Sequence, residues 1–498
     1  MDRQRTPVLV GVAQYTHREK TDRQLDPIEM MASVGREAAH DAGLGDVPSI
    51  DILGIVNCIS KALREPAAQL SERLHIDPSW SGYTSIGATA PQWFVNRFAE
   101  KIWEGRSEWA LVCGAEAFYT RQPITPLTGL VRSHTEIEER MQASFVGDTR
   151  IPVTALELRY GLVRPVDMYA LFDNARRAHR GQTIAEHRQE LADFCAGLSQ
   201  SAAQNRFSWS RKPREPDTIA RVTEQNRMIS FPYTKLMCSN AQVNQAAAVL
   251  MTNVAQAEAA GISKDQMVFV RGCGEAEDVF HPSERSNLWE SPSVAQAVDL
   301  ALHQASVALN EIDYLDLYSC FPSASRVVAD MLGLDGLAPA RASITGGMAC
   351  FGGPGNNYSL HAICTLVELL RQEPNTVGLV HSLSWYLSKH CVGVYSSQPG
   401  QVPWHQSGPA PETPAYGPVS VIEEANGKGT VESYSLVYNR EGQPERATVV
   451  GRDEQQNRFL AQTALEPDVV QAMTDTEIIG RSGTVRHDRS TGTNIFVL

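Results

Sequence analysis

The sequence lacks the features that define several special classes of protein. Its nine cysteines include no Cys-x-x-Cys pair and follow no regular spacing, which argues against a disulfide framework and against a zinc site. No apolar run is long enough to span a membrane, and the N-terminus has no signal-peptide core. The 44 Lys and Arg are outnumbered by 57 Asp and Glu, and the net charge of −13 disfavours nucleic acid and anionic membranes as partners. We therefore expect a cytoplasmic protein with reduced thiols and no metal ion.

The strongest positive feature is an internal repeat. Three apolar stretches recur in the same order about 260 to 270 residues further on: Val8–Val10 at Val268–Val270, Ile50–Cys58 at Ile312–Cys320, and Ala110–Val112 at Gly378–Val380. The alternative is a chance likeness between apolar strands, but the shared order and the nearly constant offset argue against it. The chain is therefore expected to contain two copies of one α/β module.

Between these stretches the hydrophobic spacing alternates between the strand and the helix period. It predicts strands over 8–13, 50–58, 109–113 and 377–381, and helices over 27–42, 91–104, 294–309 and 358–370. Asp26 stands where a side chain can cap the first of these helices, and Gly43 stands where the helix can end. The alternation indicates an α/β protein with a mainly parallel or mixed sheet.

Changes in composition divide the chain into domains. Residues 1–265 form the first half, and 121–230 within it are expected to be an inserted lobe, because the rhythm breaks there and 16 basic residues face 13 acidic ones over Arg121–Arg227. Residues 266–397 form the second half, and the Pro- and Gly-rich 398–418 form a linker. Strand-like runs in 419–498 predict a small, barrel-like β-domain. Acids outnumber bases 12 to 8 in this domain, which argues against nucleic-acid binding.

Four short motifs stand at turns beside the predicted strands and helices. They are Thr84-Ser85-Ile86-Gly87, Tyr318-Ser319-Cys320-Phe321, Gly346-Gly347 followed by Gly352-Gly353-Pro354, and His381-Ser382-Leu383-Ser384. Together with the duplicated halves, their order resembles the thiolase superfamily over about residues 5–397. The nearest likeness is to sterol-carrier-protein type thiolases. The extra β-domain resembles that of thiolase-like proteins of type 1, which carry an additional C-terminal domain.

The resemblance implies a fold and a ligand. The fold would be an α/β duplication with two similar halves in five layers, an inserted loop lobe and a small C-terminal β-domain. Thiolases bind coenzyme A thioesters, so the implied ligand is coenzyme A or an acyl-CoA, without a covalently bound cofactor. Thiolases are usually dimers. The strand that would pair, 79–83, is a poor β-former, so monomer and homodimer both remain open.

The resemblance also indicates that the family's nucleophile and base are both replaced. Thr84 occupies the position of the nucleophilic cysteine, and a hydroxyl without an adjacent base is not activated. Its alternative role is that of a helix cap or turn hydroxyl. Gly353 occupies the position of the histidine in Gly-His-Pro, and glycine has no group that transfers a proton. His361 lies in an apolar helix and is interpreted as a packed residue.

Two positions keep a reactive side chain. Cys320 corresponds to the cysteine of the family's His-Asp-Cys-Phe motif, which acts as acid or base, and His381 corresponds to the histidine of His-Asn-Leu-Gly. Both are candidate catalytic residues, although a lone cysteine is ordinarily a small buried hydrophobe. Trp385 and Tyr386 replace the family's glycines after that histidine, so we expect them to fill or reshape the acyl pocket.

The densest basic patch contains Arg211, Lys212 and Arg214. It is either a solvated loop or a clamp that holds the phosphates of coenzyme A. The favoured function is a thiolase-like, acetyl-CoA acetyltransferase-like protein with a degenerate site, which binds a coenzyme A thioester or acyl chain. A protein partner at the β-domain is a further hypothesis. The alternative is an active acyl-CoA acyltransferase or lyase that uses Cys320 and His381 in an altered mechanism.

Overall fold

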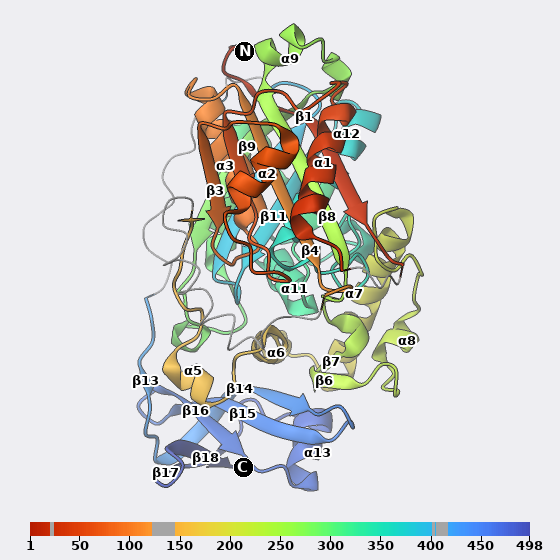
Figure 1. Ribbon diagram of the computed structural model, residues 1–498. Coiled ribbons are helices and arrows are strands. Elements are labelled where there is room, and N and C mark those ends of the chain that lie inside the picture. Colours follow the sequence, from red (N-terminus) through yellow and green to blue (C-terminus); the bar gives the residue numbers. More distant parts are fainter. Residues whose placement is uncertain (20–23, 122–144, 401–403, 405–416) are drawn as a thin grey trace.

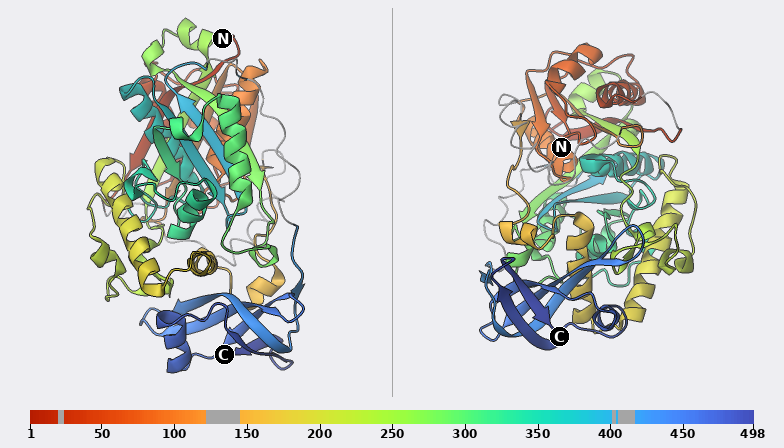
Figure 2. Two further views of the ribbon diagram at one scale, coloured as in Figure 1. Left: turned by 180° about the vertical axis from the view of Figure 1, so that it is seen from behind. Right: turned by 60° about the horizontal axis from the view of Figure 1, so that its bottom comes forward.

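A computed structural model describes residues 1–19, 24–121, 145–400, 404 and 417–498. An α/β body makes up most of the molecule, and the β-rich C-terminal domain lies at one end of it (Figure 1). Views from behind and from below show the same arrangement (Figure 2). The linker expected over 398–418 lies largely outside the described residues, as does part of the expected lobe.

The first half of the body is built on one run of strands in the order β1-β8-β4-β2-β3-β5. Their bounds are β1 Pro7–Thr16, β2 Ile52–Ile55, β3 Trp80–Thr84, β4 Trp109–Ala117, β5 Phe145–Val146 and β8 Asn244–Asn253. Strand β8 is antiparallel to both β1 and β4, whereas β2 is parallel to β4 and to β3.

The second half repeats this pattern. Its order is β10-β11-β12-β9, with bounds β9 Val268–Glu277, β10 Tyr314–Leu317, β11 Val377–Ser384 and β12 Lys389–Ser396. Strand β12 is antiparallel to β9 and β11, and β10 is parallel to β11. Each strand of the repeat found in the sequence therefore has its counterpart in the same place: β1 with β9, β2 with β10 and β4 with β11. A short β1–β9 pairing at Val8 and Leu9 joins the halves into one sheet.

Helices arrange the two halves into five layers. Helices α1 and α2 cover one face of the first half, α3 and α12 lie between the halves, and α10 and α11 cover the far face of the second half, as the three apolar cores of the body show. Their bounds are α1 Pro27–Asp41, α2 Pro66–Leu74, α3 Ala90–Trp103, α10 Pro292–Ala305, α11 Pro322–Met331 and α12 Tyr358–Gln372. The duplicated α/β fold expected from the sequence is thus confirmed.

The same close contact between strand and helix occurs in both halves. A Cβ on Gly11 of β1 would lie 1.9 Å from the carbonyl oxygen of Ala38 in α1. A Cβ on Gly274 of β9 would lie 1.8 Å from the carbonyl oxygen of Ala297 in α10. Only glycine allows the backbones to approach this closely. The shared device explains why the first helix of each half packs on its first strand.

The lobe in the first half is helical where the structure describes it. It contains α5 Ala155–Arg159, α6 Pro165–His179, α7 Ile184–Gln204 and α8 Pro216–Ala220, followed by β6 Met228–Phe231 and β7 Tyr233–Thr234. Helix α9, Val254–Ala259, follows β8. None of the helices in the described part of the chain has the length and apolarity that a membrane-spanning helix needs.

The C-terminal domain is a barrel-like sheet, as the sequence predicted. Its bounds are β13 Val421–Ile422, β14 Gly427–Tyr438, β15 Pro444–Asp453, β16 Arg458–Thr463, α13 Pro467–Asp475, β17 Ser482–Asp488 and β18 Thr493–Val497. The pairings β14–β15, β15–β16, β16–β18, β18–β17 and β17–β14 close a ring of strands. Strand β6 of the lobe also pairs with β14, so the lobe and this domain share one sheet.

Candidate functional site

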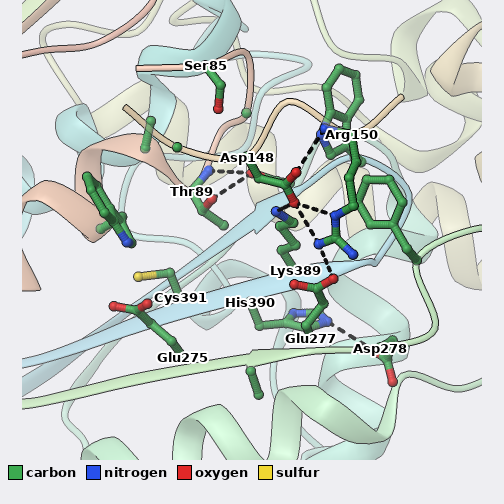
Figure 3. A pocket seen from close by; sticks show the side chains of 18 of the residues that line it. Ser85, Thr89, Asp148, Arg150, Glu275, Glu277, Asp278, Lys389, His390 and Cys391 are labelled. Carbon is green, nitrogen blue, oxygen red and sulfur yellow. Dashed lines mark hydrogen bonds and ion pairs between the residues drawn. The ribbon is translucent and has the colours of Figure 1, made fainter. Parts of the chain in front are cut away.

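A pocket of about 870 Å³ opens where the two halves meet (Figure 3). The turn from β3 to α3 forms one side of it, over residues 84–90. The end of β9, the β11–β12 hairpin and residues 147–150 form the other sides. Strands β9, β11 and β12 belong to the second half, whereas the β3–α3 turn belongs to the first. The pocket is therefore the place where the duplicated modules converge.

The turn that carries Thr84 uses its hydroxyl for structure. Thr84 is 2% exposed, and its Oγ1 accepts a hydrogen bond of 3.0 Å from the backbone N–H of Asn57. The Asn57 side-chain amide also donates to the Thr84 carbonyl oxygen at 3.0 Å. These contacts hold Thr84 as a turn hydroxyl, one of the two roles that the sequence left open for it besides acylation. It does not cap α3, whose N-cap residue is Thr89.

A side chain at position 353 would require Ser239 to move. A Cβ on Gly353 would lie 2.1 Å from Oγ of Ser239, and the Gly353 N–H donates to the Asn240 carbonyl at 2.8 Å. The loop is thus held against the segment that precedes β8. His361, the other histidine nearby, is buried in α12 with Nδ1 2.9 Å from Oε1 of Gln14, and burial lowers its pKa to about 3. It is a packed residue, as the sequence indicated.

Cys320 lies at the start of α11 in aromatic surroundings. It is half-buried, and desolvation of the thiol raises its pKa to about 12, although a hydrogen bond with Tyr169 opposes the shift. Phe321 stacks beside it, with ring centroids 5.1 Å from Tyr169 and 5.7 Å from Tyr233. The Tyr169 hydroxyl donates to the Trp385 carbonyl at 2.7 Å, which connects this cluster to the pocket wall. At neutral pH Cys320 is a thiol, not a thiolate.

His381 is placed with a second histidine and not with Cys320. It is 1% exposed on β11, and its Nε2 lies 2.9 Å from Nδ1 of His390 on β12. Burial, together with the neighbouring His390, holds the pKa of His381 well below its usual range, so the ring is neutral. The two residues that keep reactive groups are therefore held in separate networks.

The β11–β12 hairpin carries the bulky residues expected at the acyl pocket. Trp385 lines the pocket with a φ of 58°, a conformation that costs a bulky residue about 1–3 kcal/mol. Tyr386 points the other way, because it is 2% exposed and its hydroxyl donates to the Val163 carbonyl at 2.8 Å. Trp385 thus shapes the pocket, while Tyr386 fills the adjoining core.

The sequence did not identify the charged wall of the pocket. Arg150 lies 2.6 Å from Asp148 and also pairs with Glu277, and Lys389 pairs with Asp148 (Figure 3). Burial alone would raise the pKa of Asp148, but the hydrogen bonds from Arg150 and Lys389 hold it well below its usual range. These side chains come from three distant segments. The only local signal was the pair of acids at the end of β9, Glu275 and Glu277.

The basic patch lies on the segment after α7. Arg211 and Lys212 are exposed, and Arg214 is half-buried. Just before them, the N–H groups of Trp209 and Ser210 donate to the carbonyls of Phe351 and Cys350, at 2.7 and 2.9 Å. The patch is therefore anchored to the residues that precede Gly352 and Gly353. In the part of the chain that the structure describes, no group of three or more His, Cys, Asp or Glu could hold a metal ion.

Comparisons with known proteins agree with one another. The family description "Thiolase-like protein type 1 additional C-terminal domain" matches residues 411–490. A crystal structure of a monomeric SCP2-thiolase like protein type 1 from Mycobacterium smegmatis is similar over 100% of both chains, with a TM-score of 0.85 and 29% sequence identity.

Two curated relatives are more distant. A 3-ketoacyl-CoA thiolase from Aeromonas hydrophila is 24% identical over 210 residues, which cover 41% of this chain and 51% of the relative. An acetyl-CoA acetyltransferase from Schizosaccharomyces pombe is 27% identical over 134 residues, which cover 27% of this chain and 31% of the relative. The chain thus spans about half the length, or less, of the curated relatives it matches.

Proposed function

We propose that this chain, which is a thiolase-like protein with an additional C-terminal domain, binds a coenzyme A thioester or its acyl chain and does not form the acyl-enzyme of thiolysis. The observation that carries the proposal is the state of the two replaced positions. The Thr84 hydroxyl serves as a buried acceptor for the Asn57 N–H, and Gly353 has no side chain and packs against Ser239. Covalent catalysis needs an activated nucleophile beside a base, and neither position supplies one.

The basic patch supports coenzyme A as the ligand. Arg211, Lys212 and Arg214 gather positive charge on a segment anchored beside the Gly352–Gly353 turn. Arg18 adds a further positive charge beside this patch. Its guanidinium donates to the Arg206 and Ser208 carbonyls, at 2.9 and 3.0 Å, on the segment that leads to Arg211. Arginine and lysine side chains form charge-assisted hydrogen bonds to phosphate oxygens. We propose that this patch holds the nucleotide phosphates.

Titration calorimetry with coenzyme A and acetyl-CoA tests this assignment. We expect measurable, weak and salt-sensitive binding to the wild type. Changing Arg211, Lys212 and Arg214 together to Ala should weaken it about tenfold or more, which corresponds to about 1.4 kcal/mol. A matched triple variant of exposed barrel residues, Lys428, Arg486 and Arg489 to Ala, removes the same charge elsewhere and should bind like the wild type. Equal affinities in the two triple variants would reject the clamp.

Turnover assays test the second half of the proposal. With acetoacetyl-CoA and free coenzyme A, we expect no thiolysis above background and no acyl adduct on the protein by mass spectrometry, because no thiolate stands at position 84. Robust thiolysis that disappears in Thr84→Ala would overturn the proposal.

The second candidate function is acyl transfer or carbon–carbon bond cleavage that uses Cys320 and His381. It is favoured by one observation: Cys320 is half-buried and is linked through Tyr169 to the pocket wall at Trp385. The raised pKa of the thiol and the separate network of His381 weigh against it. If any acyl-CoA turnover is found, Cys320→Ser and His381→Gln should abolish it under this alternative, whereas full activity in both variants would make the two residues structural.

We also propose that the protein is a monomer. The similar Mycobacterium smegmatis protein is described as monomeric. In this chain β5 pairs with the outer edge of β3 at Tyr83 and Thr84, the strand through which thiolases pair.

A protein partner at the C-terminal domain is a further hypothesis, and pull-down with that domain deleted would test it.

A further inference from the structure

The strands of the C-terminal barrel are connected as in an OB-fold. Around the ring they follow the order β14, β15, β16, β18, β17 and back to β14. The pairing of β16 with β18 is parallel, the other pairings of the ring are antiparallel, and α13 lies between β16 and β17 in the sequence. An OB-fold binds its ligands on the face of its second and third strands. In this chain those strands are β15 and β16.

The outer face of β15 and β16 is covered by the body of the same chain. Val450 and Leu460 stand opposite each other in the register of the two strands and belong to an apolar core of the body. Val449 and Phe459 point the other way, because side chains alternate along a strand, and they belong to the core of the barrel. The face that an OB-fold offers to a ligand therefore packs against the protein's own α/β body.

At one end of this face two arginines hold main-chain carbonyls of the body. Arg452 and Arg458 are also opposite each other in the register. Arg458 donates to the carbonyls of Ser283 and Ser286, at 3.0 and 3.1 Å. Arg452 donates to the same Ser286 carbonyl at 2.9 Å, and Glu432 on β14 pairs with both guanidinium groups. The barrel thus binds the loop between β9 and α10 through the loop's backbone.

The other side of this loop is a wall of the pocket. Phe280 and Glu284 line the pocket, as does Pro418, which precedes the barrel. The guanidinium carbon of Arg150 lies 4.1 Å from the centroid of the Phe280 ring, so the loop also supports the charged wall. The N–H of Val419 donates to the Glu284 carbonyl at 2.8 Å. The loop is therefore held at its carbonyls by the C-terminal part of the chain, while Phe280 and Glu284 face the pocket.

We propose that the C-terminal domain is an OB-type barrel whose ligand face holds the chain's own pocket loop, 279–286, and that Arg452 and Arg458 are positioning residues of the pocket. They act on the pocket through the loop backbone. Arginine donates charge-assisted hydrogen bonds in a fixed geometry, so loss of one of them releases this wall. A ligand that needs the wall in place and the docking of the loop on the barrel then stabilise each other by the same free energy. This role of the domain goes beyond the proposed function.

Hydrogen–deuterium exchange of the full-length protein, followed by mass spectrometry, tests whether the barrel holds the loop. Arg452→Ala removes a donor to the loop, and Arg446→Ala is the matched control. Arg446 lies on the same strand, donates to the Gly161 carbonyl at 2.9 Å, and is 29% exposed against 22% for Arg452. We expect amides within 279–286 to exchange about tenfold faster in Arg452→Ala and at the wild-type rate in Arg446→Ala. Unchanged exchange of the loop in Arg452→Ala would overturn the proposal, as would an equal increase throughout β8, which would mean a general loss of stability.

Affinity for acetyl-CoA, measured by calorimetry, tests the effect on the pocket, and this measurement rests on the proposed function. We expect Arg452→Ala to weaken binding about fivefold or more, and Arg452→Lys, which keeps a donor, to restore part of the loss. Arg446→Ala should bind like the wild type. If Arg452→Ala binds acetyl-CoA as tightly as the wild type does, the positioning role is wrong although coenzyme A binding stands. If the wild type does not bind acetyl-CoA, the proposed function fails, and exchange of the loop alone decides the role of the barrel.

Discussion

Thr84 ends strand β3 of the first half and Gly353 lies in a loop of the second half, and contacts with neighbouring segments hold both. Asn57 donates to the Thr84 hydroxyl, and the Ser239 side chain occupies the space beside Gly353. The sequence alone predicts that both positions are replaced, since they fall within motifs of recognisable order. The structure adds that a side chain at position 353 would require Ser239 to move, because a Cβ there would lie 2.1 Å from the Ser239 Oγ.

Glu116 provides a pH test at the same scale. It is fully buried at the end of β4, where it accepts from the N–H groups of Ile59 and Ser60 at 2.7 and 2.8 Å. Burial raises its pKa to about 7, although the hydrogen bonds from Ile59 and Ser60 oppose the shift. A carboxyl with a raised folded-state pKa stabilises fully below the unfolded-state pKa. We therefore expect its contribution, at most about 3 kcal/mol, to decline as pH rises from about 4.5 to about 7.

The measurement compares melting temperatures across this range for the wild type and Glu116→Gln. The variant should lose the part of the pH dependence that falls between about pH 4.5 and 7. Glu454→Gln, at an exposed turn of the barrel, is the control and should follow the wild-type profile. Identical profiles for Glu116→Gln and the wild type would contradict the assignment.

At the scale of single elements, strand β16 shows how the barrel is attached to the body. Strand β16 carries Arg458, which is 0% exposed and donates to the Ser283 carbonyl at 3.0 Å as well as to Glu432 on β14. Removal of Glu432 leaves a buried guanidinium without its counter-charge. We expect Glu432→Ala to destabilise the protein by about 3–5 kcal/mol, measured by chemical or thermal unfolding.

The matched control for this prediction is Glu423→Ala. Glu423 also pairs with an arginine, Arg159, but both side chains are largely exposed, at 66% and 40%. Exposed pairs contribute little, so this variant should lie within about 1 kcal/mol of the wild type. Similar losses in the two variants would show that burial is not what makes the Arg458 contact important.

At the scale of the whole molecule, the edge of the large sheet decides whether copies can associate. β5 covers the last two residues of β3, and the Trp80 ring covers Gly82, where a Cβ would lie 2.5 Å from it. Covered or blunted edges do not template pairing with another chain. We expect a monomer of about 54.7 kDa by size-exclusion chromatography with light scattering. A species of twice that mass at micromolar concentration would contradict this.

The sequence by itself determined the duplication and the order of the main strands along the chain, and it predicts the loss of the nucleophile and base. Apolar periodicity repeats wherever a strand is buried, so β1, β2 and β4 could be matched to β9, β10 and β11. The predicted helices over 27–42 and 358–370 begin at the same residues as α1 and α12. Helices α6 and α7 were not predicted. The buried residues of α6 include charged ones such as Arg176 and Arg177, and those of α7 include His187 and Ser199, so neither helix has a purely apolar stripe.

The tertiary structure alone decided the pocket and the pairing of His381 with His390. The pocket's charged wall joins Asp148, Glu277 and Lys389, and the histidine pair joins β11 to β12. Such contacts arise from strand register and from crossing between the halves, which no local pattern encodes. A single histidine in a strand looks the same in sequence whether its ring packs against apolar side chains or against another imidazole. The fold was therefore readable from periodicity, whereas the chemistry depends on long-range placement.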